Sequence, residues 1–406
     1  MPKVITDEKL IDEILTRGVE NIFPSREELK KVLMSGKRIR LYCGYDPTAK
    51  ALHIGNAISI NKLGQFQKLG HEVIFLIGDF TGMIGDPTDK SATRKKLTRE
   101  EALGNSENYQ KQASGYLKFD GENPAKVLRN SEWSDKINFK DLIELSSNFT
   151  VQQMLQRDMF QQRLKEEKPI YLHEFLYPLV QANDSVEMDV DLEIGGNDQM
   201  FNMLCGRDLI KAMKNKEKFV LTIKLLADEN GKKMGKTEGN VVNLDETPEN
   251  MFGQIMAWSD GLINPGFELC TNLVKNIVAE IKEKMKNPDN NPRDLKLQLA
   301  YEITKINYGE EKAKEAQDYF IKTFSQKEIP EDIRVVPSPA PSISIIDYMM
   351  ETGLAKSKSE ARRVVEQGGL EIDGKKNTDP KALLDDSYDG KVIKFGKKDF
   401  VKIKFE

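Results

Sequence analysis

The hydrophobic pattern of the first 225 residues alternates between short apolar runs and longer stretches with helical spacing. The short runs are rich in Val, Ile, Leu and Phe, which favours buried strands. They cover residues 38–44, 72–78, 125–128 and 219–225. The longer stretches predict helices and cover residues 1–35, 55–69, 98–119, 140–145, 174–186 and 197–211. Strands that alternate with helices predict a parallel sheet with crossover helices, in a doubly wound α/β domain.

The pattern changes after residue 240. The next 80 or so residues contain no convincing strand and predict four helices, at 251–258, 262–285, 292–308 and 310–323. Prolines at positions 330, 337, 339 and 341 mark a linker, and two short helices and several short strands follow it. We therefore expect a Rossmann-type parallel-sheet domain, an all-α domain, a proline-rich linker and a small α+β module. The expected bounds are 1–240, 241–328, 329–342 and 343–406.

Composition narrows the class of protein. The chain has 406 residues and a net charge of -4, which argues against a surface coated in positive charge for non-specific nucleic-acid binding. No stretch approaches the roughly 20 apolar residues of a membrane span, and the N-terminus has no secretory or transit pattern. Cys43, Cys205 and Cys270 lack a Cys-x-x-Cys spacing, so we expect neither structural disulfides nor a zinc site. A cytoplasmic protein without a membrane partner is expected.

Two short motifs indicate a phosphate site. His53-Ile54-Gly55-Asn56 opens a predicted helix after a strand and a turn that contains Asp46 and Thr48, and free N–H groups at a helix N-terminus bind phosphate. Lys233-Met234-Gly235-Lys236-Thr237 follows another strand end and supplies cations. A lone histidine is usually a cap or a core residue, and a lysine-rich turn is usually solvated. Because both motifs occur at predicted strand ends, together they predict a site that closes around ATP.

Further polar residues follow the other predicted strands. Asp86 ends the segment Thr81-Gly82-Met83-Ile84-Gly85-Asp86, and a buried carboxylate there could hold an ammonium group; Lys90 and Arg94 follow in a polar loop. They are either solvated charges or cations that reach a polyphosphate. Tyr177, Gln181 and Asp184 share one face of a predicted helix. That helix leads into Gly195-Gly196-Asn197-Asp198-Gln199, which is typical of a strand-to-helix turn that approaches a ligand closely.

These motifs together resemble the signatures of class I aminoacyl-tRNA synthetases, and the surrounding residues narrow the resemblance to tyrosyl-tRNA synthetases of the bacterial type. The resemblance covers essentially the whole chain. It includes Tyr42-x-Gly44-x-Asp46-Pro47-Thr48, the Thr81–Pro87 segment, the Tyr177, Gln181 and Asp184 face, and Gly195-Gly196-x-Asp198-Gln199. Asn56 replaces the histidine of many members, and Gly235 replaces the serine of the general class. Both variants are similar to those of other tyrosyl enzymes.

The resemblance implies roles for individual residues. Those expected to bind tyrosine are Tyr42, Thr81, Asp86, Tyr177, Gln181, Asp184 and Gln199. Those expected to bind ATP are Gly44, Asp46, Gly55, Asn56, Gly196, Asp198 and Lys236. Those expected to act on the phosphates are Thr48, His53, Lys90, Arg94, Lys233, Lys236 and Thr237. Within the first group, Tyr42 and Asp184 would contact the phenol hydroxyl.

The implied reaction needs no nucleophilic side chain. The carboxylate of L-tyrosine attacks the α-phosphorus of ATP, pyrophosphate leaves, and the tyrosyl group is then transferred to the terminal adenosine of tRNA(Tyr). Mg²⁺ would accompany ATP as substrate, and no structural metal is expected. The family also implies a homodimer, with the interface near residues 120–165 of the first domain. A basic cluster in the last module implies RNA contact and comprises Lys356, Lys358, Arg362, Arg363, Lys375 and Lys376.

Three alternative functions are weighed at this stage. One is a different nucleotidyl transferase, which would not need the Tyr177, Gln181 and Asp184 face. A tryptophanyl-tRNA synthetase would share the fold and the reaction, but Tyr42 with Asp184 argues against it because an indole offers only a hydrogen-bond donor. A non-catalytic RNA-binding relative would keep the last module with an inert nucleotide fold. The complete set of phosphate-contacting residues argues against that alternative.

Overall fold

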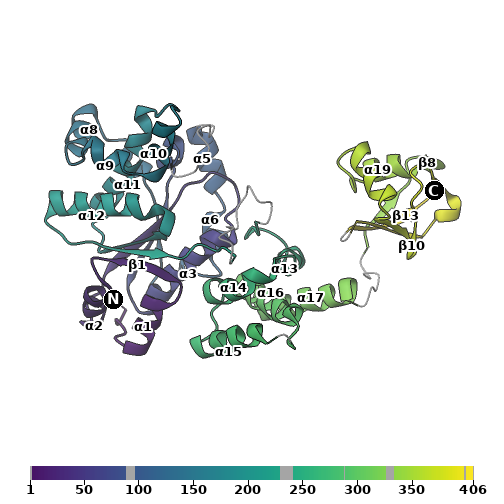
Figure 1. The fold of residues 1–406 in the computed structure, drawn as a ribbon, viewed down its shortest axis with the longest axis horizontal. Helices are drawn as coiled ribbons and strands as arrows, with labels where there is room; N and C mark the ends of the chain where they lie inside the picture. The colour runs from purple at the N-terminus through teal and green to yellow at the C-terminus, as the bar shows by residue number, and fades with distance from the viewer. Residues whose placement is uncertain are drawn as a thin grey trace. The chain divides into compact units, whose positions relative to one another are not determined.

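The computed structural model describes residues 2–87, 97–228, 241–287, 289–325, 333–396 and 399–405. The chain divides into two compact units, Met1–Phe320 and Ile321–Glu406. Figure 1 shows the elements of both units, and each unit has its own hydrophobic core. Among the described residues, no helix is both long enough and apolar enough to cross a membrane.

A six-stranded sheet forms the centre of the first unit, with strand order β1-β6-β5-β2-β3-β4. Its strands are β1 (Val19–Phe23), β2 (Arg40–Tyr45), β3 (Glu72–Ile77), β4 (Lys126–Arg129), β5 (Leu192–Gly196) and β6 (Phe219–Ile223). Neighbouring strands are parallel, except that β1 runs antiparallel to β6. The chain moves outward from β2 to β4 on one side and from β5 to β6 on the other. The strand order therefore reverses between β2 and β5, which is where such sheets bind ligands.

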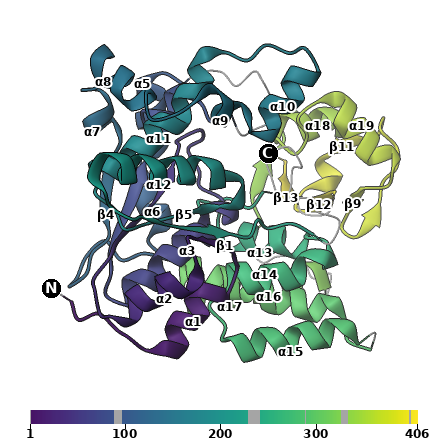
Figure 2. The same cartoon turned by 60° about the vertical axis from the view of Figure 1, so that its left-hand side comes forward.

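Helices cover both faces of this sheet, because alternate strand residues point to opposite faces. Leu41, Cys43 and Tyr45 belong to the core that contains α3 (Ile54–Lys68). Tyr42 faces the other way, toward α11 (Leu176–Glu187) and α12 (Met200–Lys214). Figures 1 and 2 show α12 and α3 on opposite sides of the strands. The predicted doubly wound domain is confirmed.

Shorter helices complete this part of the first unit. They are α1 (Glu8–Thr16), α2 (Arg26–Met34), α4 (Thr81–Ile84), α5 (Arg99–Ser106), α6 (Tyr109–Ala113), α7 (Ser131–Ser134), α8 (Phe139–Ser146), α9 (Val151–Leu155) and α10 (Asp158–Lys165). The 3-10 turns η1 (Leu172–Phe175) and η2 (Asn197–Gln199) precede α11 and α12. A further set of helices packs against the side of α3. It comprises α13 (Pro248–Met256), η4 (Asp260–Leu262), α14 (Ile263–Cys270), α15 (Lys275–Lys286), α16 (Pro292–Tyr308) and α17 (Glu310–Phe320).

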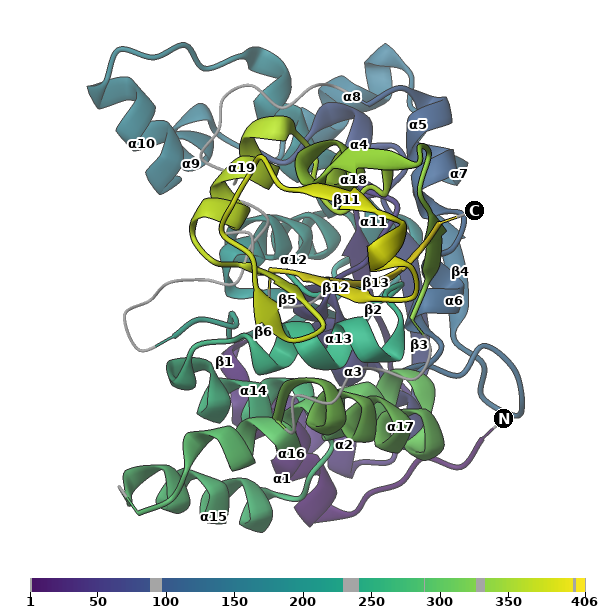
Figure 3. The same ribbon diagram turned by 90° about the vertical axis from the view of Figure 1, so that its right-hand side faces the viewer.

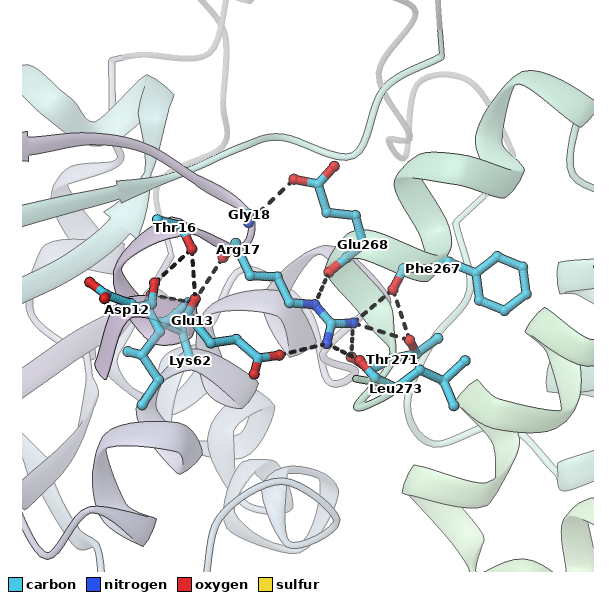
Figure 4. A network of polar contacts seen from close by, with 11 residues as sticks. Asp12, Glu13, Thr16, Arg17, Gly18, Lys62, Phe267, Glu268, Thr271 and Leu273 are labelled. Carbon is cyan, nitrogen blue, oxygen red and sulfur yellow. Dashed lines mark hydrogen bonds and ion pairs between the residues drawn. The ribbon is translucent and has the colours of Figure 1, made fainter. Parts of the chain in front are cut away.

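Arg17 joins the N-terminal segment to α14 (Figure 4). Its guanidinium donates to the carbonyl oxygens of Glu268 at 2.8 Å, Phe267 at 2.9 Å and Thr271 at 2.7 Å, and to that of Leu273. These carbonyls lie at the C-terminal end of α14, where a helix leaves its last carbonyl groups unpaired. One buried cation therefore caps a helix and ties the sheet to the helices that follow it.

The second unit is a small α+β module with a five-stranded sheet of order β10-β9-β12-β13-β7. Its elements are β7 (Val335–Pro337), β8 (Ser342–Ser344), α18 (Ile345–Glu351), α19 (Lys358–Glu366), β9 (Leu370–Ile372), β10 (Lys375–Lys376), β11 (Leu383–Asp385), η6 (Asp386–Tyr388), β12 (Val392–Phe395) and β13 (Asp399–Lys404). A π turn, Ile321–Ser325, precedes them. Figure 3 shows the helices α18 and α19 beside the strands of this module, and buried residues of these helices and strands form a separate core.

The structure corrects several predicted elements. Residues 1–35 are not wholly helical, because β1 lies between α1 and α2 and pairs with β6. The stretch 98–119 is broken after Ser106, and the stretch 262–285 is broken at Thr271, whose carbonyl binds Arg17. The predicted linker contains β7, which pairs with β13 despite its proline because Pro337 ends an edge strand. A separate helical domain from residue 241 stays a prediction, since α13–α17 lie in the first compact unit.

Candidate active site

A pocket of about 390 Å³ opens at the carboxyl ends of β2 and β5, where the strand order reverses. Every predicted active-site residue within the described ranges lines it. These are Tyr42, Gly44, Asp46, Thr48, His53, Gly55, Asn56, Thr81, Asp86, Tyr177, Gln181, Asp184, Gly196, Asp198 and Gln199. The predicted residues Lys90, Arg94, Lys233, Lys236 and Thr237 lie outside the described residues.

The first turn of α3 forms one wall of the pocket. His53 caps this helix: its Nδ1 accepts from Asn56 N at 3.3 Å, and Asn56 Oδ1 accepts from His53 N at 3.0 Å. Gly55 lies within the cap, where a Cβ atom would be 2.9 Å from the imidazole. His53 is therefore a helix cap, as the simpler interpretation of its sequence suggested. It also lines the pocket together with Gly55 and Asn56, so the cap and the predicted phosphate cradle are one structure.

The chain on both sides of the lysine motif reaches this same wall. Leu226 precedes the motif and Val241 follows it, and both line the pocket. Ile54 N donates to Val242 O at 2.9 Å, and His53 forms an isolated bridge with Asn243. The described segments that flank the second motif therefore lie beside the first motif, although more than 170 residues separate the two motifs in the sequence.

Tyr42 and Asp184 form the buried end of the pocket. Tyr42 Oη is 3.0 Å from Ser185 Oγ. Asp184 Oδ1 accepts from Trp133 Nε1 at 2.7 Å, and its Oδ2 accepts from Asn130 Nδ2 at 3.2 Å. Burial raises the pKa of Asp184 well above its ordinary value, although these two donors oppose the shift. Burial also raises the pKa of Tyr42, which keeps it a neutral phenol. A hydroxyl beside a carboxyl suits a ligand that carries its own hydroxyl.

A second polar cluster lies further along the same wall. Asp46 Oδ1 accepts from Thr81 Oγ1 at 2.6 Å, and Asp46 Oδ2 accepts from Tyr177 Oη at 2.9 Å. Gly78 makes room for this cluster, because a Cβ there would lie 2.1 Å from Asp46 Oδ1. The sequence assigned Asp46 to the nucleotide and its two partners to the amino acid. In the structure, the carboxylate of Asp46 instead contacts Thr81 and Tyr177, which were both predicted to bind the amino acid.

Gln181 offers a hydrogen-bond acceptor to the pocket. Its Nε2 donates to Glu193 Oε1 at 3.0 Å, while Oε1 is buried and has no hydrogen-bond partner among the described residues. Close by in the pocket lining, Asp86 Oδ2 accepts from Gln199 Nε2 at 2.6 Å, and Arg157 Nη2 is 3.8 Å from Asp86 Oδ1. An unpaired buried carbonyl costs free energy unless a ligand supplies the donor. The carbonyl oxygen of Gln181 and the carboxylate of Asp86 are acceptors of the kind that an ammonium group requires.

Gly196, in the β5–η2 turn, has less space around it than Gly44. A Cβ on Gly196 would lie 2.4 Å from Asp198 Oδ1 and 3.2 Å from Leu225 Cδ2, so a side chain there would displace the carboxylate of Asp198. A Cβ on Gly44 would meet only Leu76 Cδ2, at 3.8 Å. Gly44 is therefore free of steric constraint within the described residues, and its bare backbone leaves room for a ligand.

The sequence analysis missed five residues around the buried end of the pocket. They are Asn130, Trp133, Ser185, Glu193 and Lys218. A signal existed for two of them. Glu193 is a charged residue inside the apolar strand β5, and Asn130 directly follows β4 at the carboxyl edge of the sheet. No sequence pattern marks the contact of Lys218 with Glu193, because it depends on the pairing of β5 with β6.

The predicted RNA-binding residues all lie on the surface of the second unit. Lys358, Arg362 and Arg363 are exposed on α19, Lys356 precedes it, and the exposed β10 consists of Lys375 and Lys376. Lys358 Nζ also forms an ion pair with Asp347 Oδ1 at 2.7 Å. Solvent access is what contact with a phosphate backbone requires.

Two family models match the chain. One is described as tRNA synthetases class I (W and Y) and matches residues 34–325. The other is described as tyrosine–tRNA ligase SYY-like C-terminal domain and matches residues 325–403. Similar proteins include the tyrosine–tRNA ligase of Thermotoga maritima, 42% identical over 392 residues and 96% of each chain. That of Aquifex aeolicus is 42% identical over 96% of this chain and 97% of its own.

Solved structures support the fold at lower sequence identity. A C-terminally truncated mitochondrial tyrosyl-tRNA synthetase from Aspergillus nidulans aligns with a TM-score of 0.66 and 20% identity. The alignment covers 78% of this chain and 94% of that one. The tyrosyl-tRNA synthetase from Archaeoglobus fulgidus, solved with L-tyrosine, aligns with a TM-score of 0.59 and 21% identity, over 77% of this chain and all of that one.

Proposed function

The chain belongs to the tyrosyl-tRNA synthetases of class I and is therefore a tyrosine–tRNA ligase; on this premise we propose how its pocket performs the reaction. L-Tyrosine and ATP form tyrosyl-adenylate and pyrophosphate, and tyrosine is then transferred to the terminal adenosine of tRNA(Tyr). The observation that carries the proposal is the division of the pocket. Hydroxyl and carboxyl groups occupy its buried end, and the N-terminus of α3 forms its wall.

In the proposed complex, the phenol lies between Tyr42 and Asp184. The phenol donates its proton to the carboxylate of Asp184 and accepts a hydrogen bond from the hydroxyl of Tyr42. The α-ammonium lies by Gln181 Oε1, the carboxylate of Asp86 and the hydroxyl of Tyr177, all of which line the pocket. Thr81 supports this group through Asp46, and Gln199 approaches the substrate carboxylate.

The nucleotide occupies the other end. The first turn of α3, with His53, Gly55 and Asn56, accepts phosphate groups, and Thr48 lies in the adjoining turn. Asp198 binds the ribose, and the bare backbone of Gly44 and Gly196 lets the adenosine approach. The substrate carboxylate is then aligned with the α-phosphorus, so the rate gain comes from orientation and from stabilisation of phosphate charge.

The remaining phosphate contacts belong to segments outside the described residues. We assign Lys90, Arg94, Lys233, Lys236 and Thr237 to the pyrophosphate in the transition state. The support is that the described residues beside both segments, Asp86 and Leu226 among them, line the pocket. Contacts that form mainly in the transition state raise kcat rather than ground-state affinity.

Mg²⁺ is proposed to arrive with ATP. Among the described residues, no group of three or more His, Cys, Asp or Glu side chains is placed to hold a metal. The ion would be held mainly by phosphate oxygens and water, which is how Mg²⁺ binds in many nucleotide sites. It would lower the negative charge of the phosphates.

For the second step, we propose that the module of the second unit binds tRNA(Tyr) through the exposed basic residues of α19 and β10. Contacts of this type are made to the phosphate backbone and depend on salt. The same substrates, tRNA and ATP, are why we propose the cytoplasm as the working compartment.

We propose that a second copy of the chain covers the outer surface of α8 and its neighbours. Phe139 and Leu172 are each 79% exposed, and Ile143 and Val151 are more than half exposed. Apolar side chains gathered in this way mark interaction surfaces. Phe139→Asp with Ile143→Asp should shift the molecular mass from dimer toward monomer in analytical ultracentrifugation. Val274→Asp, at a separate exposed position, should leave the mass unchanged.

ATP–pyrophosphate exchange with single amino acids tests the assigned activity. Exchange should depend on tyrosine and be far weaker with phenylalanine or tryptophan. Exchange that occurs with tryptophan and not with tyrosine would make the alternative tryptophanyl assignment correct.

A further inference from the structure

A buried ion pair lies directly beneath the amino-acid end of the pocket. Lys218 is fully buried, and the side chain of Glu193 is 3% exposed. Their charged groups are in direct contact. Glu193 stands beside Tyr42 in the register of β5 with β2, and Lys218 immediately precedes β6. The pair is therefore held by the sheet itself, and Glu193 lines the pocket beside Tyr42.

The surroundings of Lys218 fit a protonated amine. An ammonium group has three N–H donors and no acceptor. Lys218 Nζ has three acceptors: Glu193 Oε2, Ser185 Oγ at 2.7 Å and Met203 O at 3.2 Å. Gly206 makes room for this head group, because a Cβ there would lie 2.5 Å from Nζ. Burial lowers the pKa of Lys218, and Glu193 opposes that shift.

This arrangement constrains the hydroxyl of Ser185. Because Lys218 can only donate, Ser185 Oγ must accept from it, and the serine proton must go elsewhere. The available acceptors are Tyr42 Oη at 3.0 Å and Glu193 Oε2 at 3.5 Å, and the shorter contact favours Tyr42. Tyr42 then accepts from Ser185, and its own proton is left to point into the pocket.

The substrate requires this direction. An ionised Asp184 can only accept, so the phenol proton goes to Asp184 and the phenol oxygen needs a donor. Among the described residues at this end of the pocket, Tyr42 is the donor that is left, because Trp133 and Asn130 already donate to Asp184. Each group thus donates to the next. Lys218 donates to Ser185, Ser185 to Tyr42, Tyr42 to the substrate phenol, and the phenol to Asp184.

We propose that Lys218 is a positioning residue for tyrosine selection, which sets the direction of the Ser185–Tyr42 hydrogen bond so that Tyr42 donates to the substrate phenol. The inference rests on the proposed binding of the phenol between Tyr42 and Asp184. Lys218 does not touch the substrate and acts only through Ser185. Phenylalanine lacks the oxygen that completes this series of hydrogen bonds, so it leaves the Tyr42 proton unpaired.

The test compares exchange kinetics for tyrosine, phenylalanine and 4-aminophenylalanine, whose amine is chiefly a donor. The variants are Lys218→Met, Lys218→Met with Ser185→Ala, and Tyr42→Phe. The matched control is Lys62→Met, which removes another buried lysine; that side chain binds the carbonyls of Ile14 and Arg17 and does not line the pocket. The readout is the ratio of kcat/KM between substrates, which cancels losses that affect all amino acids equally.

Without Lys218, the buried carboxylate of Glu193 has lost its cation and accepts the proton of Ser185, and Tyr42 donates back to Ser185. We expect Lys218→Met to lower the tyrosine-to-phenylalanine ratio about tenfold and to raise the use of 4-aminophenylalanine relative to tyrosine. Adding Ser185→Ala should restore most of the tyrosine preference, because nothing then holds the Tyr42 proton. A role in stability alone predicts further damage from the second substitution. Lys62→Met should leave both ratios unchanged.

The possible failures are distinguishable. If Tyr42→Phe lowers the ratio but Lys218→Met does not, or if Ser185→Ala restores nothing, the inference is wrong and the pocket assignment stands. If Tyr42→Phe leaves the ratio unchanged, the pocket assignment itself is wrong. If Lys218→Met does not fold, the preference between tyrosine and 4-aminophenylalanine is measured in the unsubstituted enzyme. A donor at Tyr42 predicts at least a tenfold preference for tyrosine over 4-aminophenylalanine, and the reverse preference overturns the proposal.

Discussion

Replacing Asp184 by asparagine tests the buried end of the pocket. The carboxylate accepts from Trp133 Nε1 at 2.7 Å and from Asn130 Nδ2 at 3.2 Å, and we expect it to accept the phenol proton too. An amide has only one acceptor oxygen, so its NH₂ must face one of these donors. Asn130 cannot turn around, because its Oδ1 already accepts from Phe80 N at 2.9 Å.

The magnitude follows from the loss of one hydrogen bond to a charged group, which contributes about 1.5–3 kcal/mol. At about 1.36 kcal/mol for each factor of ten, kcat/KM for tyrosine should fall about 10- to 150-fold. Phenylalanine, which has no phenol group, should lose much less. Steady-state exchange with both amino acids measures the ratio, and far-ultraviolet circular dichroism checks that the variant is folded. An unchanged ratio in a folded variant would refute the assignment of Asp184.

The same carboxyl group predicts a pH dependence. Burial raises its pKa, so on acidification Asp184 takes up a proton at a higher pH than an ordinary aspartate. Tyrosine preference should therefore decline on the acid side before exposed carboxylates titrate, and Asp184→Asn should remove that decline. For stability the sign is opposite: the native state holds this proton more tightly, so its contribution is full below the unfolded pKa and is lost as pH rises through the folded pKa.

Three other predictions address separate parts of the chain. Arg17→Met should lower the free energy of unfolding of the first unit by about 3–5 kcal/mol, because it leaves a set of buried carbonyls unpaired. Unfolding can be followed by tryptophan fluorescence, since both tryptophans lie in that unit. Arg26→Met, which breaks an exposed ion pair, should cost less than about 1 kcal/mol. Removing residues 333–406 should spare exchange but weaken tRNA charging, and normal charging would exclude the RNA role. Lys233→Ala should slow adenylate formation in single-turnover experiments, and an unchanged rate would exclude its phosphate role.

The sequence predicted those features that depend on local pattern. The strands near 38–44 and 72–78 and the helix that begins at His53 follow from apolar runs, spacing and a capping residue, and the structure has them as β2, β3 and α3. The rule that parallel strands bind ligands at their carboxyl ends then placed every described active-site residue in one pocket. Local pattern and topology were sufficient because each motif directly follows a strand.

Features that depend on contacts between distant segments could not be predicted in this way. The local pattern around β1 predicted a helix. In the structure this segment is a strand that pairs with β6, some 200 residues away, and the pairing outweighs the local preference. At the break between α14 and α15, the carbonyl of Thr271 likewise accepts from a distant residue, Arg17, which lies more than 250 residues earlier. Lys218 gives no sign of its role because a lysine before a strand is usually at the surface.

The charge distribution of the pocket favours one spatial arrangement of the two substrates. The amino-acid end carries the carboxyl groups of Asp46, Asp86, Asp184 and Glu193, while the phosphate end is formed by a helix N-terminus with partial positive charge. An ammonium group is attracted to the first end, and a polyphosphate is repelled from it. This charge distribution supports the proposed orientation, in which tyrosine has its ring and ammonium inward and its carboxylate outward. In that orientation the nucleophile of the first step, the carboxylate of the substrate, faces the α-phosphorus, and this step needs no catalytic base from the protein.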